Sequence, residues 1–131
     1  MRKNRFLFSG FTLVELMVAT IIIGVLIAIS VPLYLRHAEQ AMGAKALENI
    51  KNIFNAEMMY MVDNQTFTAD RTALNRYSFI GPNDAEWTYG ITATQTTFII
   101  TAVRTSLNSA YNGLQISMNQ SSVITGVPYP P

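Results

Sequence analysis

The chain has 131 residues, of which half are hydrophobic and only 13% are charged, so it has room for one small domain beside a membrane segment. Three of its cations, Arg2, Lys3 and Arg5, precede Gly10, and the remainder therefore carries a net charge of +1 − 3 = −2. This balance argues against a nucleic-acid-binding surface, and the absence of cysteine excludes disulfides and thiolate chemistry.

An almost continuous apolar run from Leu16 to Leu35 follows a short basic segment, residues 1–10. Twenty residues of helix rise by roughly 30 Å, which is the hydrocarbon thickness of a bilayer. The preceding cations favour a cytoplasmic N-terminus. We therefore predict a single-pass segment in a bacterial inner membrane, with the rest of the chain on the outer side.

Three residues in or directly before this run are unusual for a membrane helix. Glu15 lies near its start, and an acid at membrane depth is a functional hypothesis that requires a partner. Gly24 weakens a helix by about 1 kcal/mol relative to alanine, and Pro32 removes a backbone hydrogen bond. Gly24 and Pro32 therefore mark the stretch where we expect the helix to be most flexible.

Residues 36–64 continue the helix in an amphipathic pattern. Apolar residues recur at steps of three and four, which predicts one stripe that packs against a head domain; the stripe comprises Leu47, Ile50, Phe54, Met58 and Met61. The segment from Asp63 to Asp84 is rich in loop-forming residues, with a short turn of helix expected over residues 70–75.

Four segments after residue 86 alternate between apolar and polar residues, as strands do. They cover residues 87–94, 97–104, 114–118 and, more briefly, 123–127, with a tight hairpin turn around Gln95. The predicted fold class is α+β: a long N-terminal helix whose second half packs against a small antiparallel sheet of three or four strands.

No group of residues in the sequence has the composition of an active site. His37 is the sole histidine, and no nucleophile, base and orienting group occur together, so we predict neither an enzyme nor a bound cofactor. Calcium is the one metal to consider, because it binds loops rich in carboxylates; the weak candidates are Asp63, Asp70, Asp84 and Glu86.

Two processing routes are conceivable for the N-terminus. A secretory signal peptide would be cut after the small residues around Ala28 and Ser30, leaving Val31 first. The length of the apolar run, the acid within it and Pro32 just beyond that site all argue against this route. The alternative is a cut upstream of the apolar run.

The sequence Gly10-Phe11-Thr12-Leu13-Val14-Glu15, after a basic leader and before an apolar helix with Gly24 and Pro32, resembles the type IV pilin superfamily, which includes the pseudopilins of type II secretion. The resemblance implies that a prepilin peptidase removes the leader 1–10 between Gly10 and Phe11. It also implies that the new amine of Phe11 is methylated.

The resemblance further implies a role for each unusual residue of the apolar run. Glu15 would pair with the Phe11 amine of a neighbouring subunit and set the axial register of a filament. Gly24 and Pro32 match positions between which pilin helices lose regular structure in filaments. Major pseudopilins bind calcium in a comparable loop, although no such ligand run is identified here.

We interpret the chain as a structural subunit of a type IV pilus-like filament. Its parts are the leader 1–10, the membrane and polymerisation helix 11–35, the amphipathic helix 36–64 and the head 65–131. The expected partners are filament subunits of the same or another kind, the peptidase and the inner-membrane assembly machinery, and the filament would be periplasmic or extracellular. One alternative is a type II secretion pseudopilin, and another is a monomeric, membrane-tethered periplasmic binding module.

Overall fold

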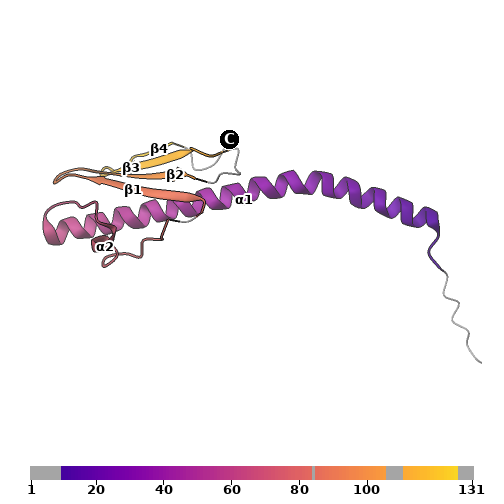
Figure 1. Ribbon diagram of the computed structural model, residues 1–131, viewed down its shortest axis with the longest axis horizontal. Helices are drawn as coiled ribbons and strands as arrows, with labels where there is room; N and C mark the ends of the chain where they lie inside the picture. The colour runs from indigo at the N-terminus through magenta and orange to yellow at the C-terminus, as the bar shows by residue number, and fades with distance from the viewer. Residues whose placement is uncertain (1–9, 84, 106–110, 127–131) are drawn as a thin grey trace, which may run out of the picture. The chain divides into compact units, whose positions relative to one another are not determined.

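The computed structural model describes residues 10–83, 85–105 and 111–126. Its chain divides into two compact units, the first ending at His37 and the second beginning at Ala38. The elements in chain order are the helices α1 (Leu13–Asn64) and α2 (Arg71–Leu74), then the strands β1 (Trp87–Ala93), β2 (Phe98–Arg104), β3 (Gln115–Asn119) and β4 (Ile124–Gly126) (Figure 1).

Helix α1 is one uninterrupted helix of 52 residues, as predicted. It ends where Gln65 adopts a left-handed backbone conformation (φ 57°), a common way to stop a helix. The helix continues through Gly24 and Pro32, although Pro32 has no N–H to donate to the carbonyl of Ala28. Flexibility at this stretch therefore stays a prediction.

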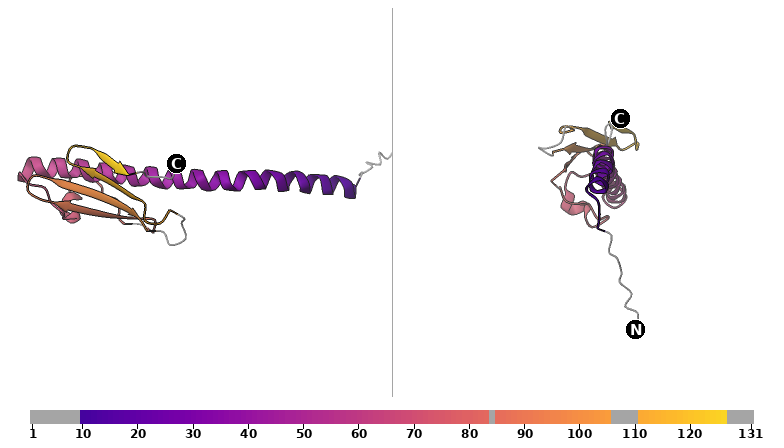
Figure 2. Two further views of the ribbon diagram at one scale, coloured as in Figure 1. Left: turned by 90° about the horizontal axis from the view of Figure 1, so that it is seen from above. Right: turned by 90° about the vertical axis from the view of Figure 1, so that its right-hand side faces the viewer.

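The four strands form an antiparallel meander in the order β1-β2-β3-β4. Each observed strand lies within about one residue of its predicted boundaries, and the turn from Thr94 to Thr97 confirms the expected hairpin. The register aligns Tyr89 with Ala102 and Ala102 with Ile116, and all three are buried. Figures 1 and 2 show the sheet lying along the part of α1 that belongs to the second unit.

The core forms where the sheet packs on α1, which confirms the α+β prediction. It combines apolar side chains from the helix, the connecting loop and three strands; its members are Ala46, Ile50, Ile53, Ala56, Leu74, Ile80, Trp87, Tyr89, Phe98, Ile100, Ala102, Ile116 and Met118.

The predicted apolar stripe of α1 is partly wrong. Ile50 is buried, but Leu47, Phe54 and Met61 are only half-buried and Met58 is exposed. The buried face instead includes small residues such as Gly43 and Ala46. It also includes polar Asn49, whose amide donates to Tyr89 Oη at 3.1 Å.

The loop between α1 and β1 is fixed by its own polar contacts. Asp70 caps the short helix α2 by accepting a hydrogen bond from the Thr72 N–H at 2.8 Å. Arg71 reaches across the loop and donates to the Gly81 carbonyl at 2.6 Å and to Asn83 Oδ1 at 2.8 Å. This loop therefore carries Leu74 and Ile80 into the core.

The solvent face of the sheet is uncharged along its described strands. Residues that pair across the strands point to the same face, so Gly90, Thr101, Ser117 and Thr125 lie in one row across it. The neighbouring rows contain only hydroxyl, amide and aliphatic side chains, namely Thr88, Thr92, Ile99, Val103, Gln115 and Asn119. The charged side chains of the second unit are therefore concentrated on the helix and the connecting loop.

Candidate processing and assembly site

The start of α1 is held by a reciprocal capping box between Thr12 and Glu15. The Thr12 N–H and hydroxyl both donate to Glu15 Oε2, at 2.8 and 2.7 Å, while the Glu15 N–H donates to Thr12 Oγ1 at 3.2 Å. Such a box satisfies backbone donors that have no partner within the helix. Glu15 therefore has a role within its own chain: it fixes the point where the helix begins.

The bond between Gly10 and Phe11 lies just before this cap, outside the helix. Both residues are exposed, with 82% of Phe11 accessible, and a side chain added at Gly10 would meet nothing within 4 Å. A protease requires an accessible, non-helical peptide bond. The bond at Gly10 meets that requirement, and cutting it would leave a new α-amine four residues before Glu15.

The segment that follows has the properties of a membrane span. An 18-residue stretch of α1 reaches a mean hydropathy of 2.7, and α1 is the one described helix long and apolar enough to cross a bilayer. Its hydroxyl groups donate within the helix, from Thr20 to the Met17 carbonyl and from Ser30 to the Leu26 carbonyl. Polar side chains in such a helix are therefore satisfied without water, as a bilayer requires.

The predicted site residues lie in different places. Gly10, Phe11 and Glu15 come together at the start of α1, whereas Gly24 and Pro32 lie further along the same helix. Prediction of this group was possible because its members are neighbours in sequence. The contribution of Thr12 was missed, although the Thr-x-x-Glu spacing before an apolar run signals a capping box.

The calcium candidates do not form a site within the described part of the chain. Asp70 caps α2, Glu86 pairs with Arg104, and Asp63 lies exposed in the last turn of α1. Asp84 lies outside the described residues. No group of three His, Asp or Glu side chains able to hold a metal occurs among the residues described, so the geometry of these residues does not support the calcium candidates.

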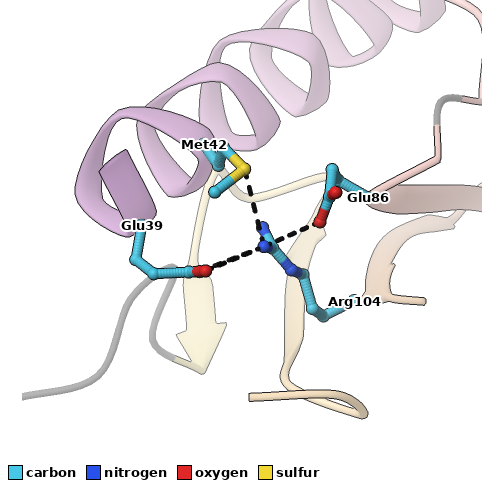
Figure 3. A network of polar contacts seen from close by, with 4 residues as sticks. All are labelled: Glu39, Met42, Glu86 and Arg104. Atoms are coloured by element: carbon cyan, nitrogen blue, oxygen red, sulfur yellow. Dashed lines mark hydrogen bonds and ion pairs between the residues drawn. The ribbon is translucent and has the colours of Figure 1, made fainter. Parts of the chain in front are cut away.

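A single buried arginine, Arg104, connects β2 to α1 through a cluster of contacts. These contacts were not predicted from the sequence. Arg104 Nη2 lies 3.0 Å from Glu39 on α1 and 2.8 Å from Glu86 before β1 (Figure 3). It also donates to the sulfur of Met42 at 3.5 Å, and the guanidinium lies 5.5 Å from the centre of the Trp87 ring. The signal in the sequence was an arginine in register with the inward-facing Phe98, Ile100 and Ala102.

A second buried charge, Glu57, holds the loop after α1. Its side chain is inaccessible, with Oε2 accepting from the Thr68 N–H at 3.1 Å and Oε1 without a partner among the residues described. Burial raises the pKa of the Glu57 carboxyl above its ordinary value, and the Thr68 hydrogen bond opposes this in part. The protonated form is thereby favoured.

Comparison with known proteins supports the N-terminal motif and a wider similarity. The prokaryotic N-terminal methylation motif matches residues 6–31. Type II secretion system core protein G of Pseudomonas aeruginosa is 39% identical over 66 residues, 50% of this chain and 46% of that protein.

The core protein G of Escherichia coli K12 is 40% identical over 65 residues, 50% of this chain and 45% of that protein. The core protein G of Vibrio cholerae is 41% identical over 67 residues, which are 51% of this chain and 43% of that protein. The chain thus spans about half the length of the curated relatives it matches. These similarities confirm the resemblance to the type IV pilin superfamily, which includes the pseudopilins.

Proposed function

We propose that the chain is a pseudopilin-like structural subunit of a type II secretion system. It is processed after Gly10, anchored by the apolar part of α1, and assembled from the inner membrane into a periplasmic filament. The observation that carries the proposal is the methylation motif, with its exposed bond at Gly10 and its capped acid at Glu15. The similarity to core proteins of type II secretion systems is the reason for proposing that system.

This proposal takes the pseudopilin alternative over the type IV pilus that the sequence pattern favoured. The pilus interpretation rested on the missing calcium ligands, which is a weak argument beside matches to type II secretion core protein G from several bacteria. Those relatives are core proteins of a secretion system by name, which agrees with a structural role and not an enzymatic one.

Glu15 gives the filament its register in this proposal. A carboxylate within an apolar helix bundle is tolerated when it is paired and strongly penalised when it is not. The Phe11 amine created by the peptidase on a neighbouring subunit would provide the pair. A subunit at the wrong height would leave both charges without partners, so the wrong register is disfavoured.

The mass of the mature N-terminal peptide tests the processing step. We expect a peptide that begins at Phe11 and carries one added methyl group, recovered from membranes of cells that express the chain with its own peptidase. A Gly10→Leu variant, which places a bulky side chain at the cleavage site, should accumulate with the leader attached. A mature chain that begins at Val31 would contradict the proposal.

Deletion of the gene in its host distinguishes secretion from pilus assembly. We expect folded substrate proteins to accumulate in the periplasm, while shearing still releases the same surface pili as from the parent strain. Loss of surface pili with normal secretion would favour the type IV pilus instead. In the parent strain, which makes the protein, a protein that stays in the membrane fraction and never cross-links to further copies would favour the monomeric tether.

A further inference from the structure

Two adjacent methionines on α1 are the most accessible methionines in the described part of the second unit. Met58 and Met59 are 42% and 52% exposed, whereas Met118 in the sheet is 2% exposed. Met42 and Met61 are only half-buried, and Met42 already accepts a contact from Arg104. The thioethers of Met58 and Met59 are therefore the ones that dissolved reagents reach most easily within the described part of the second unit.

These side chains line an open apolar groove of about 390 Å³ at the end of α1. The groove is bounded by Asn55, Met58, Met59, Val62, Tyr77 and Ser78. Its far wall is fixed, because the Tyr77 ring meets the Tyr60 ring edge-on at 5.8 Å and its hydroxyl accepts from Asn64 Nδ2 at 3.3 Å. The two methionines are therefore two of the six residues that line a defined surface.

We propose that Met58 and Met59 form a site of reversible oxidation by small peroxides. A lone pair of the thioether sulfur attacks one oxygen of hydrogen peroxide, so that an S–O bond forms and the O–O bond breaks. The sulfur-bound oxygen then loses its proton, and the displaced hydroxide takes up that proton and leaves as water. The sulfur is oxidised by two electrons to the sulfoxide, and the peroxide is reduced by the same two.

Within the described part of the second unit, the composition leaves this pair as the most accessible sulfur atoms. Cysteine, the usual competitor for peroxide, is absent, and Trp87 is buried with 1% of its surface exposed. A sulfoxide is polar and chiral, so oxidation converts an apolar groove into a hydrogen-bond-accepting one. Methionine sulfoxide reductases reverse the change with electrons from a dithiol.

Peptide mass mapping of the full-length protein in detergent tests the site. With limiting hydrogen peroxide, we expect Met58 and Met59 to gain one oxygen each on the order of tenfold faster than Met118. A Met58→Leu/Met59→Leu variant should lose this fast uptake, whereas Met118→Leu should keep it. Reductase with dithiol should remove the added oxygen. Equal rates at Met58, Met59 and Met118 would overturn the proposal.

Retention on a phenyl column reads out the polarity of the groove. Oxidised wild-type protein should elute earlier than untreated protein, and the Met58→Leu/Met59→Leu variant should elute at the same position before and after peroxide. An unchanged wild-type elution after complete oxidation of both residues would refute the proposed change in the surface. Neither measurement depends on cleavage at Gly10 or on filament assembly, so it is independent of the proposed function.

Discussion

At the scale of single residues, Glu15 has a capping role and a proposed register role, and one substitution can separate them. As a helix cap it needs only an acceptor for the Thr12 N–H, whereas as a register device it needs a negative charge. Glutamine keeps the acceptor and removes the charge. We therefore expect Glu15→Gln to retain the helix content of the wild type in detergent, as measured by circular dichroism, and to retain processing after Gly10.

The same variant should fail to enter filaments, as measured by cross-linking between copies in membranes. Glu15→Val should fail as well and should also lose the two capping hydrogen bonds that Thr12 donates to the carboxylate. Glu48→Gln, which removes an exposed acid further along α1, is the matched control and should assemble normally. Normal assembly of Glu15→Gln would show that its charge has no part in subunit register.

Glu57 makes the stability of the head depend on pH in an unusual direction. Its folded-state pKa is raised above the ordinary value of 4.5, so the folded state holds the proton more tightly than the unfolded state. The contribution to stability is complete below pH 4.5 and is lost as pH rises through the raised pKa. We expect Glu57→Gln to remove that loss, measured as the free energy of unfolding in urea at several pH values.

At pH 8 the Glu57→Gln variant should be more stable than the wild type by about 1 kcal/mol, because no buried charge remains incompletely paired. The amide can still accept the hydrogen bond from the Thr68 N–H. Glu48→Gln again serves as the control and should leave the pH dependence unchanged. A wild-type slope that persists in Glu57→Gln would mean that another group causes it.

Local sequence accounts for the N-terminal residues but not for the buried charges. Gly10, Phe11 and Glu15 form a motif whose spacing is visible without a fold. From the sequence alone, Glu57 would be expected on the solvent-facing side of an amphipathic helix. Its burial is explained by the loop after α1, where the Thr68 N–H donates to its carboxylate. The periodicity of the helix cannot predict a contact such as that between Glu57 and Thr68, because the tertiary fold brings these residues together.

At the scale of elements, Arg104 joins β2 to the start of the α1 segment in the second unit. Its guanidinium is 2% exposed, while the side chains of Glu39 and Glu86 are 21% and 37% exposed. Breaking a buried ion pair costs about 3–5 kcal/mol, but carboxylates that reach water recover part of this. We expect Arg104→Met to lower the free energy of unfolding by about 2 kcal/mol, measured in urea.

Arg104→Lys should recover only part of that loss, because an ammonium cannot bridge two carboxylates and stack on Trp87 as a planar guanidinium does. Arg76→Met, at an exposed arginine in the loop, is the matched control and should change stability by less than about 0.5 kcal/mol. Equal effects at Arg104 and Arg76 would show that the cluster does not fasten the sheet.

The elements themselves were predictable because each has its own period. Alternation over residues 87–93 and 98–104 indicates strands with one buried face, and steps of three and four indicate α1. The face of α1 that meets the sheet was not predictable from hydrophobicity alone. Gly43 and Ala46 are buried for their small size, and Met58 is left exposed despite its apolar side chain.

At the scale of the whole molecule, the hydrophobic core of the described residues belongs to the second unit, and its members run in sequence from Ala46 to Met118. A unit with its own core can fold alone. We expect a protein of residues 38–131 to be soluble without detergent and to unfold in one cooperative thermal transition. Ile53→Ala, which empties a fully buried position, should lower its stability by about 2–5 kcal/mol. A gradual, non-cooperative melt would show that the head needs the apolar segment.

The uncharged outer face of the sheet has a consequence for how ionic strength acts on an assembly. Contacts through that face contain no ion pairs to screen, whereas contacts through the outward side of α1 would involve Lys45, Glu48 and Lys51. The Debye length falls from about 10 Å at 0.1 M salt to about 3 Å at 1 M. For the protein of residues 38–131, which excludes the apolar segment, association that persists in concentrated salt would therefore point to packing through the outer face of the sheet, and dissociation would point to the charged helix.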